Sequence, residues 1–167
     1  MVTEQGNEGS APIEEDESMK KAGKLLTMRG SIPMNTNGQR LQIFDGKYTT
    51  GYRIVEFYVA PENPSEAQSI LMKAFTSKTT PSISKFDWGD SQEIAWATWG
   101  IDTGTGGANF FLIDEDNMVI EDLYLSFYSE TGDNDYANYY IVLQKYEFPA
   151  WTGAGFLVEN LGQGGPQ

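Results

Sequence analysis

Residues 114–148 read DEDNMVIEDLYLSFYSETGDNDYANYYIVLQKYEF and contain two long stretches with the pattern of β-strands. Aromatic and β-branched residues recur at period two after Val119 and again after Asn138, and clusters of Asp, Asn and Gly bound both stretches. Residues 130–135 between them supply turn chemistry, because Gly and Asn accept positive φ and Asp and Asn cap local backbone groups. We therefore predict the central hairpin of an antiparallel sheet here.

The middle of the second stretch is apolar on both of its faces. Tyr139, Ile141 and Leu143 fall on one face, and Tyr140 and Val142 fall on the other. A strand of this kind belongs to a sheet that is covered on both sides, by a second sheet or by a neighbouring subunit.

Six further stretches have the strand pattern, centred near residues 25, 40, 55, 72, 96 and 111. An Asn37-Gly38 pair predicts a hairpin turn between the first two. The stretch near 72 also fits a helix, since Ser65 followed by Gln68 resembles a capping box, but the all-β context favours a strand. Eight strands predict an all-β fold, a single antiparallel β-sandwich of jelly-roll type. In the strand near residue 55, we expect Val55, Phe57 and Val59 to lie together on the buried face.

The two ends of the chain differ from its middle in composition. Residues 1–24 are rich in Glu, Gly, Ser and Asp and hold few apolar side chains, which predicts an acidic extended arm that needs a partner surface to become ordered. An ordinary flexible terminus is the alternative. We assign residues 25–161 to the sandwich domain and residues 162–167 to a flexible tail.

The sequence contains no Cys and no His. Disulfides, thiolate metal sites, Ser-His and Cys-His nucleophiles and histidine-bound zinc are therefore excluded. A net charge of −13 and a pI near 4.2 argue against nucleic-acid binding, which needs clustered Lys and Arg. No run of about 18 apolar residues is present, and the polar start lacks the core of a signal peptide. We expect a soluble protein that does not bind a membrane and does not leave the cell through a signal peptide.

Three polar motifs were candidates for chemistry. Residues 104–107 are glycine-rich but lack the Lys and the following helix of a phosphate-binding loop. The acidic loops 114–117 and 133–135 offer oxygens that suit calcium, without the spacing of a known calcium loop. Glu121 and Glu147 exemplify the carboxylate pairs that a glycosidase needs. We expect no catalytic residue, no cofactor and no metal ligand, and calcium binding by the two loops stays open.

Aromatic residues make up 13% of the chain and admit two interpretations. They form either a sugar-stacking platform or, as we favour, filler for a core and for interfaces. The residues concerned are Trp88, Trp96, Trp99, Trp151, Tyr124, Tyr128, Tyr136, Tyr139, Tyr140 and Tyr146. We expect Ile83, Phe86 and Trp88 to anchor a loop at residues 81–90.

Several segments together carry a resemblance to a known class of protein. They are LQIFDG (41–46), TGYRI (50–54), FDW (86–88), EIAWA (93–97), DNMVIEDL (116–123) and NYYIVLQKYE (138–147). Over roughly residues 24–160 the chain resembles small β-rich virion structural proteins of marine tailed phages, of the capsid decoration or cement kind.

This resemblance implies a non-enzymatic virion protein on the capsid exterior that binds the major capsid protein and stabilises the shell. A homo-oligomer is expected, with a trimer favoured because capsid lattices offer threefold sites. The candidate partner-binding residues are Glu14, Glu15, Asp16 and Glu17 in the arm and Trp151, Phe156 and Leu157 near the C-terminus. A carbohydrate-binding adhesin module of the virion and a tail or neck structural protein remain as alternatives.

Overall fold

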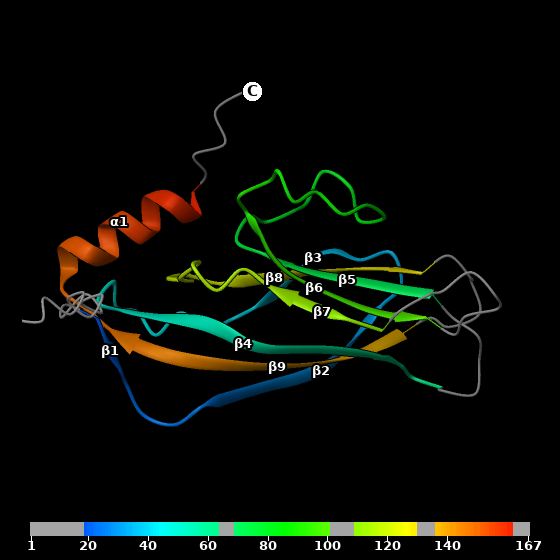
Figure 1. The fold of residues 1–167 in the computed structure, drawn as a ribbon, viewed down its shortest axis with the longest axis horizontal. Coiled ribbons are helices and arrows are strands. Elements are labelled where there is room, and N and C mark those ends of the chain that lie inside the picture. Colours follow the sequence, from blue (N-terminus) through cyan, green and yellow to red (C-terminus); the bar gives the residue numbers. More distant parts are fainter. Residues whose placement is uncertain (1–18, 64–68, 101–108, 130–135, 162–167) are drawn as a thin grey trace, which may run out of the picture.

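Two antiparallel sheets packed face to face form the body of the protein (Figure 1). The computed structural model describes residues 19–63, 69–100, 109–129 and 136–161. The predicted all-β sandwich is confirmed.

Sheet A is assembled around the strand β9. It contains β1 (Lys20–Lys21), β2 (Leu26–Pro33), β4 (Thr50–Pro61) and β9 (Tyr136–Glu147). β9 pairs with β4 along one edge and with β2, continued by the short β1, along the other. β1 falls within residues 1–24, so the last residues of the predicted arm pair with the chain's own sheet; residues 1–18 lie outside the described residues.

Sheet B has the strand order β3-β8-β5-β6-β7. Its strands are β3 (Asn37–Leu41), β5 (Ser69–Phe75), β6 (Glu93–Gly100), β7 (Phe111–Ile113) and β8 (Leu123–Ser129). The strand favoured near residue 72 is thus confirmed as β5, while Ser65 and Gln68 of the rival capping box lie outside the described residues.

The two predicted hairpins are wrong, although all four of their strands exist. β8 lies in sheet B, where Phe127 pairs with Met72, and β9 lies in sheet A, where Leu143 pairs with Leu26 and Ile54. β2 and β3 are divided between the sheets in the same way. Alternation determines which side chains face the core, but it does not determine which strand lies alongside, so neighbours in sequence were wrongly paired.

Gly38 is not part of the turn that was predicted there, and glycine is needed at this position for another reason. The backbone reverses its course nearer Asn35, which has a φ of 59°. Gly38 has a φ of 92°, and a Cβ atom there would lie 2.0 Å from the carbonyl oxygen of Lys78. Glycine is therefore required at this position by its backbone conformation and by the close approach of another segment.

Side chains from both sheets form one continuous core between the layers. Phe57 and Ile141 of sheet A and Met72 and Phe127 of sheet B are fully buried there. The prediction for Val55 is wrong, because a β-bulge between residues 54 and 56 turns its side chain outward, where it is 43% exposed.

The one helix among the described residues, α1 (Ala150–Asn160), follows β9 and covers one end of the sandwich (Figure 1). Phe156 and Leu157 pack against a second, smaller core that includes Met118, Ile120 and Phe148. The helix approaches the sandwich closely at Gly153, where a Cβ atom would lie 1.8 Å from the carbonyl oxygen of Tyr48.

Candidate binding surface

The segment between β5 and β6, residues 76–92, lies over the outer face of sheet B (Figure 1). Phe75 and Trp96 are buried, although neither belongs to the core between the sheets. The central strands of sheet B are therefore covered on both faces, as their doubly apolar sequences require.

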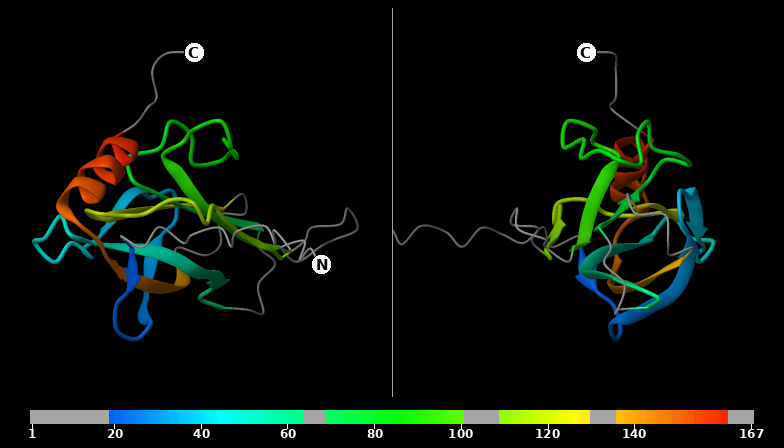
Figure 2. Two further views of the ribbon diagram at one scale, coloured as in Figure 1. Left: turned by 60° about the vertical axis from the view of Figure 1, so that its left-hand side comes forward. Right: turned by 90° about the vertical axis from the view of Figure 1, so that its right-hand side faces the viewer.

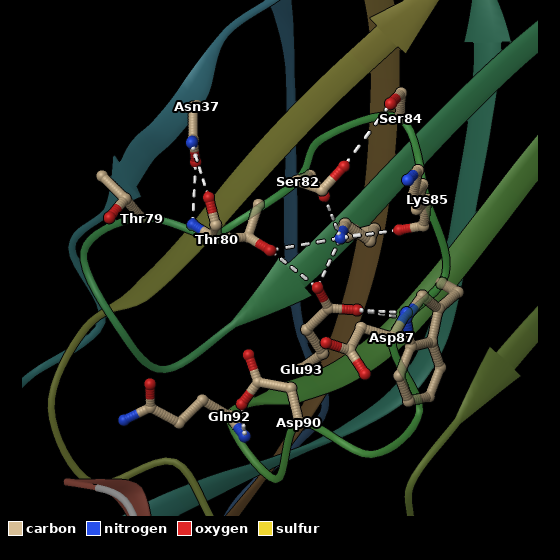
Figure 3. A network of polar contacts seen from close by, with 12 residues as sticks. Asn37, Thr79, Thr80, Ser82, Ser84, Lys85, Asp87, Asp90, Gln92 and Glu93 are labelled. Atoms are coloured by element: carbon tan, nitrogen blue, oxygen red, sulfur yellow. Dashed lines mark hydrogen bonds and ion pairs between the residues drawn. The ribbon is translucent and has the colours of Figure 1, made fainter. Parts of the chain in front are cut away.

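A buried ion pair lies under this segment, between Lys73 of β5 and Glu93 of β6 (Figure 3). Both side chains are completely inaccessible to solvent. The Lys73 ammonium also donates to the carbonyl oxygens of Ser82 at 2.5 Å and Lys85 at 2.9 Å and approaches the Thr80 hydroxyl at 3.2 Å. Every partner is an acceptor, which matches the donor-only character of a lysine ammonium.

The Glu93 carboxylate connects the same segment to the sheet from the other side of the ion pair. One oxygen accepts from the Thr80 hydroxyl at 2.7 Å. The other accepts from the Trp96 indole at 3.0 Å and from the backbone N–H of Asp87 at 3.3 Å. Both charges of the pair thus hold backbone atoms of the covering segment.

A further tether joins this segment to the edge strand β3. The side-chain amide of Asn37 donates to the carbonyl oxygen of Thr80 at 2.8 Å, and its oxygen accepts from the backbone N–H of Thr80 at 2.9 Å (Figure 3). Residues 76–92 are therefore fixed at Thr80, Ser82, Lys85 and Asp87, which is unusual rigidity for a long connection on a protein surface.

The fixed segment presents aromatic rings to solvent. Trp88 is 64% exposed, and its ring lies 5.9 Å from that of Phe86 and 6.2 Å from that of buried Trp96. The Phe86 ring stacks on Phe110 at 5.8 Å. We call Phe86, Trp88 and Phe110 the aromatic platform. We expected Ile83, Phe86 and Trp88 to anchor this loop, but Phe86 and Trp88 are exposed and Ile83 is half-buried.

Helix α1 carries a second group of exposed apolar side chains. Trp151, Val158 and Leu161 point away from the sandwich, and Trp151 is 71% exposed. Of the predicted partner-binding residues, Trp151 is therefore open to a partner, whereas Phe156 and Leu157 are partly buried against the protein's own core. Glu14, Glu15, Asp16 and Glu17 lie outside the described residues.

The platform and the helix belong to the same side of the sandwich. Both views in Figure 2 show α1 and the segment 76–92 above sheet B, on the side away from sheet A. The carbonyl oxygen of Asn160 accepts from the Thr76 hydroxyl at 3.2 Å and from the Gln92 amide at 3.4 Å, which joins the end of the helix to both ends of the segment. One side of the molecule therefore carries two groups of exposed apolar side chains, and hydrogen bonds join the elements that bear them.

A partly exposed ion pair between Asp45 and Lys145 lies at the start of β4, next to Thr50. Asp45 accepts from the Thr50 hydroxyl at 2.7 Å and from the Lys145 ammonium at 3.0 Å. Burial raises the pKa of Asp45, but the hydrogen bonds from Thr50, Lys145 and the backbone of Lys47 outweigh it, so the pKa lies below its ordinary value of 3.8. The hydrogen bond to Asp45 correspondingly raises the pKa of Lys145.

The remaining polar motifs are described only in part by the structure. Asp114 uses its carboxylate within its own loop, accepting from the Asn117 amide at 2.6 Å, and the described residues contain no group of three acidic or other metal-ligating side chains. Glu121 accepts from the Tyr48 hydroxyl at 3.4 Å, and Glu147 ends β9. Residues 104–107 and 133–135 lie outside the described residues. Within the described ranges, no helix has the length and apolar character needed to span a bilayer.

Lys73 is the residue that reasoning from sequence missed. The signal was present, because a lone lysine sits among the apolar residues of Ile70–Phe75 in a strand that was expected to be buried. A charged residue in such a position needs a buried partner.

Comparison with models of known protein families finds no match, and comparison with curated protein sequences finds no significant relative.

Proposed function

We propose that this chain is a non-enzymatic structural protein of a virion, which binds the outer face of the major capsid protein lattice and stabilises the shell. The observation that carries the proposal is the aromatic platform. Its rings are exposed, yet the segment that bears Phe86 and Trp88 is fixed to the sheet by the buried pair of Lys73 and Glu93, and Phe110 stacks on Phe86. Rigid exposed aromatic residues lose little entropy on binding and are typical of interface hot spots.

The exposed face of α1 supports the same function. Trp151, Val158 and Leu161 are exposed at α1, and α1 lies above the same face of sheet B as the segment 76–92 (Figure 2), so both groups can contribute to one interface. Burial of apolar surface contributes about 25 cal/mol per Å², and repetition over a lattice multiplies a modest contact. The acidic chain, with a net charge of −13, also suits a partner with basic patches.

The strand arrangement supports the proposal by analogy. β2 lies beside β9 in one sheet, β3 lies beside β8 in the other, and β5 pairs with β6. This nested pairing suits the jelly roll expected from the sequence, an architecture common in viral capsid and lectin domains. Because one architecture hosts many functions, the proposal depends on the platform. A trimer remains our preferred assembly on symmetry grounds.

Binding to capsid shells tests the proposal. Purified protein would be titrated onto shells of the source virus that have been stripped of accessory proteins, and bound copies per shell would be counted. We expect saturation at a lattice-like stoichiometry and, for Trp88→Ala, an affinity roughly thirtyfold lower, as befits a hot-spot residue.

Two variants and one truncation serve as comparisons. Trp151→Ala measures the contribution of the helix, and a chain beginning at Gly23 measures that of the arm. Tyr140→Ala, on the opposite sheet, should bind shells normally. Absence of binding to shells, or equal binding by all variants, would refute the capsid proposal, and binding to tail fractions instead would favour a tail or neck protein.

A further inference from the structure

The outward face of sheet A carries a shallow groove of about 540 Å³ that runs across three strands. Its floor follows one row of paired residues, Gly30 of β2, Tyr139 of β9 and Val59 of β4. Tyr139 and Val59 turn their side chains toward the core and Gly30 has none, so the backbone forms the floor. Neighbouring strands lie about 4.8 Å apart, which makes the groove about 10 Å long.

The two rows that flank this floor supply walls of different character. On one side, Arg29, Tyr140 and Tyr58 lie opposite one another, and on the other side Ser31, Asn138 and Ala60 do so. Because successive side chains of a strand alternate between faces, all six point away from the core. The groove is therefore lined by two rings and Arg29 along one side and by small and polar groups along the other.

The rings of the aromatic wall are held in place by one another. The Tyr58 ring meets Phe111 of β7 edge to face, with centroids 5.0 Å apart, and lies 6.4 Å from the Tyr140 ring. Tyr140 is 41% exposed, so much of its ring remains open to a ligand. Such a wall is prepared for stacking before any ligand arrives.

The polar side chains of the groove have unused hydrogen-bonding capacity. Among the residues that the structure describes, none accepts or donates a hydrogen bond to the side chains of Arg29, Ser31 or Asn138. Asn138 offers a donor and an acceptor, Ser31 offers a hydroxyl, and Arg29 offers several donors in one plane. A ligand with many hydroxyl groups can pair with all three.

We infer that this groove binds a short stretch of neutral oligosaccharide. The apolar faces of sugar rings stack on Tyr140 and Tyr58, while their hydroxyls pair with Asn138, Ser31 and Arg29. Charge selects a neutral chain, because Arg29 is the only charged residue among the described residues that line the groove and the whole protein carries a net charge of −13. A polyanion would meet repulsion that one cation cannot offset. The groove lies on the sheet opposite the aromatic platform, so the inference stands independently of shell binding.

The experiment follows backbone amide resonances of the ¹⁵N-labelled full-length chain by NMR. The probes are four neutral hexasaccharides, made of α-glucose, β-glucose, xylose and mannose, and one acidic probe of the same length, hexagalacturonate. We expect at least one neutral probe to shift the resonances of residues 29–31, 58–60 and 138–140. Tyr140→Ala should lower its affinity about tenfold, and Asn138→Ala should also weaken it.

Two controls separate this site from other surfaces. Tyr136→Ala alters the same strand and face with a ring of similar exposure, 45%, and should bind within twofold of the unaltered protein. Trp88→Ala should bind the sugar normally while its affinity for shells falls. No shift with any neutral probe, a preference for hexagalacturonate, or shifts confined to the aromatic platform would each overturn the inference. If Tyr140→Ala does not fold, as judged by circular dichroism, the Asn138→Ala titration decides.

Discussion

The Lys73 ammonium and the Glu93 carboxylate form a fully buried ion pair whose other hydrogen bonds all reach residues 80–96, most of them on the covering segment. Desolvation of two charges is costly, so such a pair is weak evidence for stability by itself. Here the pair fixes the position of the covering segment, and with it the position of Phe86 and Trp88.

Removal of one charge should therefore be severe. Lys73→Met leaves Glu93 buried without its counter-charge, and we expect the free energy of unfolding in urea to fall by roughly 3–5 kcal/mol. Lys85→Met makes the same substitution in the covering segment at an exposed side chain and should change stability by less than about 0.5 kcal/mol. A loss below about 1 kcal/mol for Lys73→Met would show that the pair does not constrain the segment.

The close contact of α1 with the sandwich makes a matched pair of glycine substitutions informative. Gly153→Ala forces a methyl group against the Tyr48 carbonyl oxygen, and we expect a loss of about 1–3 kcal/mol with displacement of the helix. Gly155→Ala meets no atom within 4 Å and should stabilise the protein by about 0.5–1 kcal/mol, because alanine favours a helix. Equal effects of the two substitutions in thermal unfolding would contradict the described position of α1.

Stability should depend on pH through the pair of Asp45 and Lys145. The pKa of Asp45 is lowered in the folded state, so its contribution is present above the unfolded pKa, about 3.9, and is lost as pH falls through the lower folded value. The pKa of Lys145 is raised above 10.5, so its contribution disappears as pH rises through that folded value.

Asp45→Asn tests this dependence. Urea unfolding at neutral pH should show the variant to be less stable than the unaltered protein, and the difference should shrink below about pH 4. Asp116→Asn, at an exposed loop position, should show little difference at any pH. A stability difference for Asp45→Asn that stays constant down to pH 2 would exclude the carboxylate as the source.

The alternation of apolar and polar residues was sufficient to predict eight strands, because a strand with a buried face has apolar residues at every second position. Pairing was not predictable in this way. β8 and β9 are joined by a short turn-rich segment, and a strand with two apolar faces is compatible with many neighbours. Only the packing of the complete chain decides between them.

Helix α1 illustrates a different limit. Residues 150–160 include Gly153 and Gly155, and the helix begins after Pro149 without a side-chain cap. Its propensity is therefore weak, and contacts of Phe156 and Leu157 with the smaller core stabilise it. The sequence alone does not show that these two residues pack within the chain.

The aromatic platform could not be predicted from the sequence for a related reason. The sequence does not show whether a tryptophan is exposed or buried, and the exposure of Trp88 depends on the path of residues 76–92. That path depends on Lys73 and Glu93, which lie far apart in sequence and meet only through the pairing of β5 with β6.

The central place of β9 has a consequence for biosynthesis. β2 and β4 both take β9 as their partner, and the ribosome makes β9 after every other strand that the structure describes. Until it emerges, β2 and β4 have no strand of sheet A to pair with, and unpaired strand edges promote aggregation. Sheet A must therefore form late, so a nascent chain cut short before residue 136 is a substrate for chaperones and proteases rather than a partly working protein.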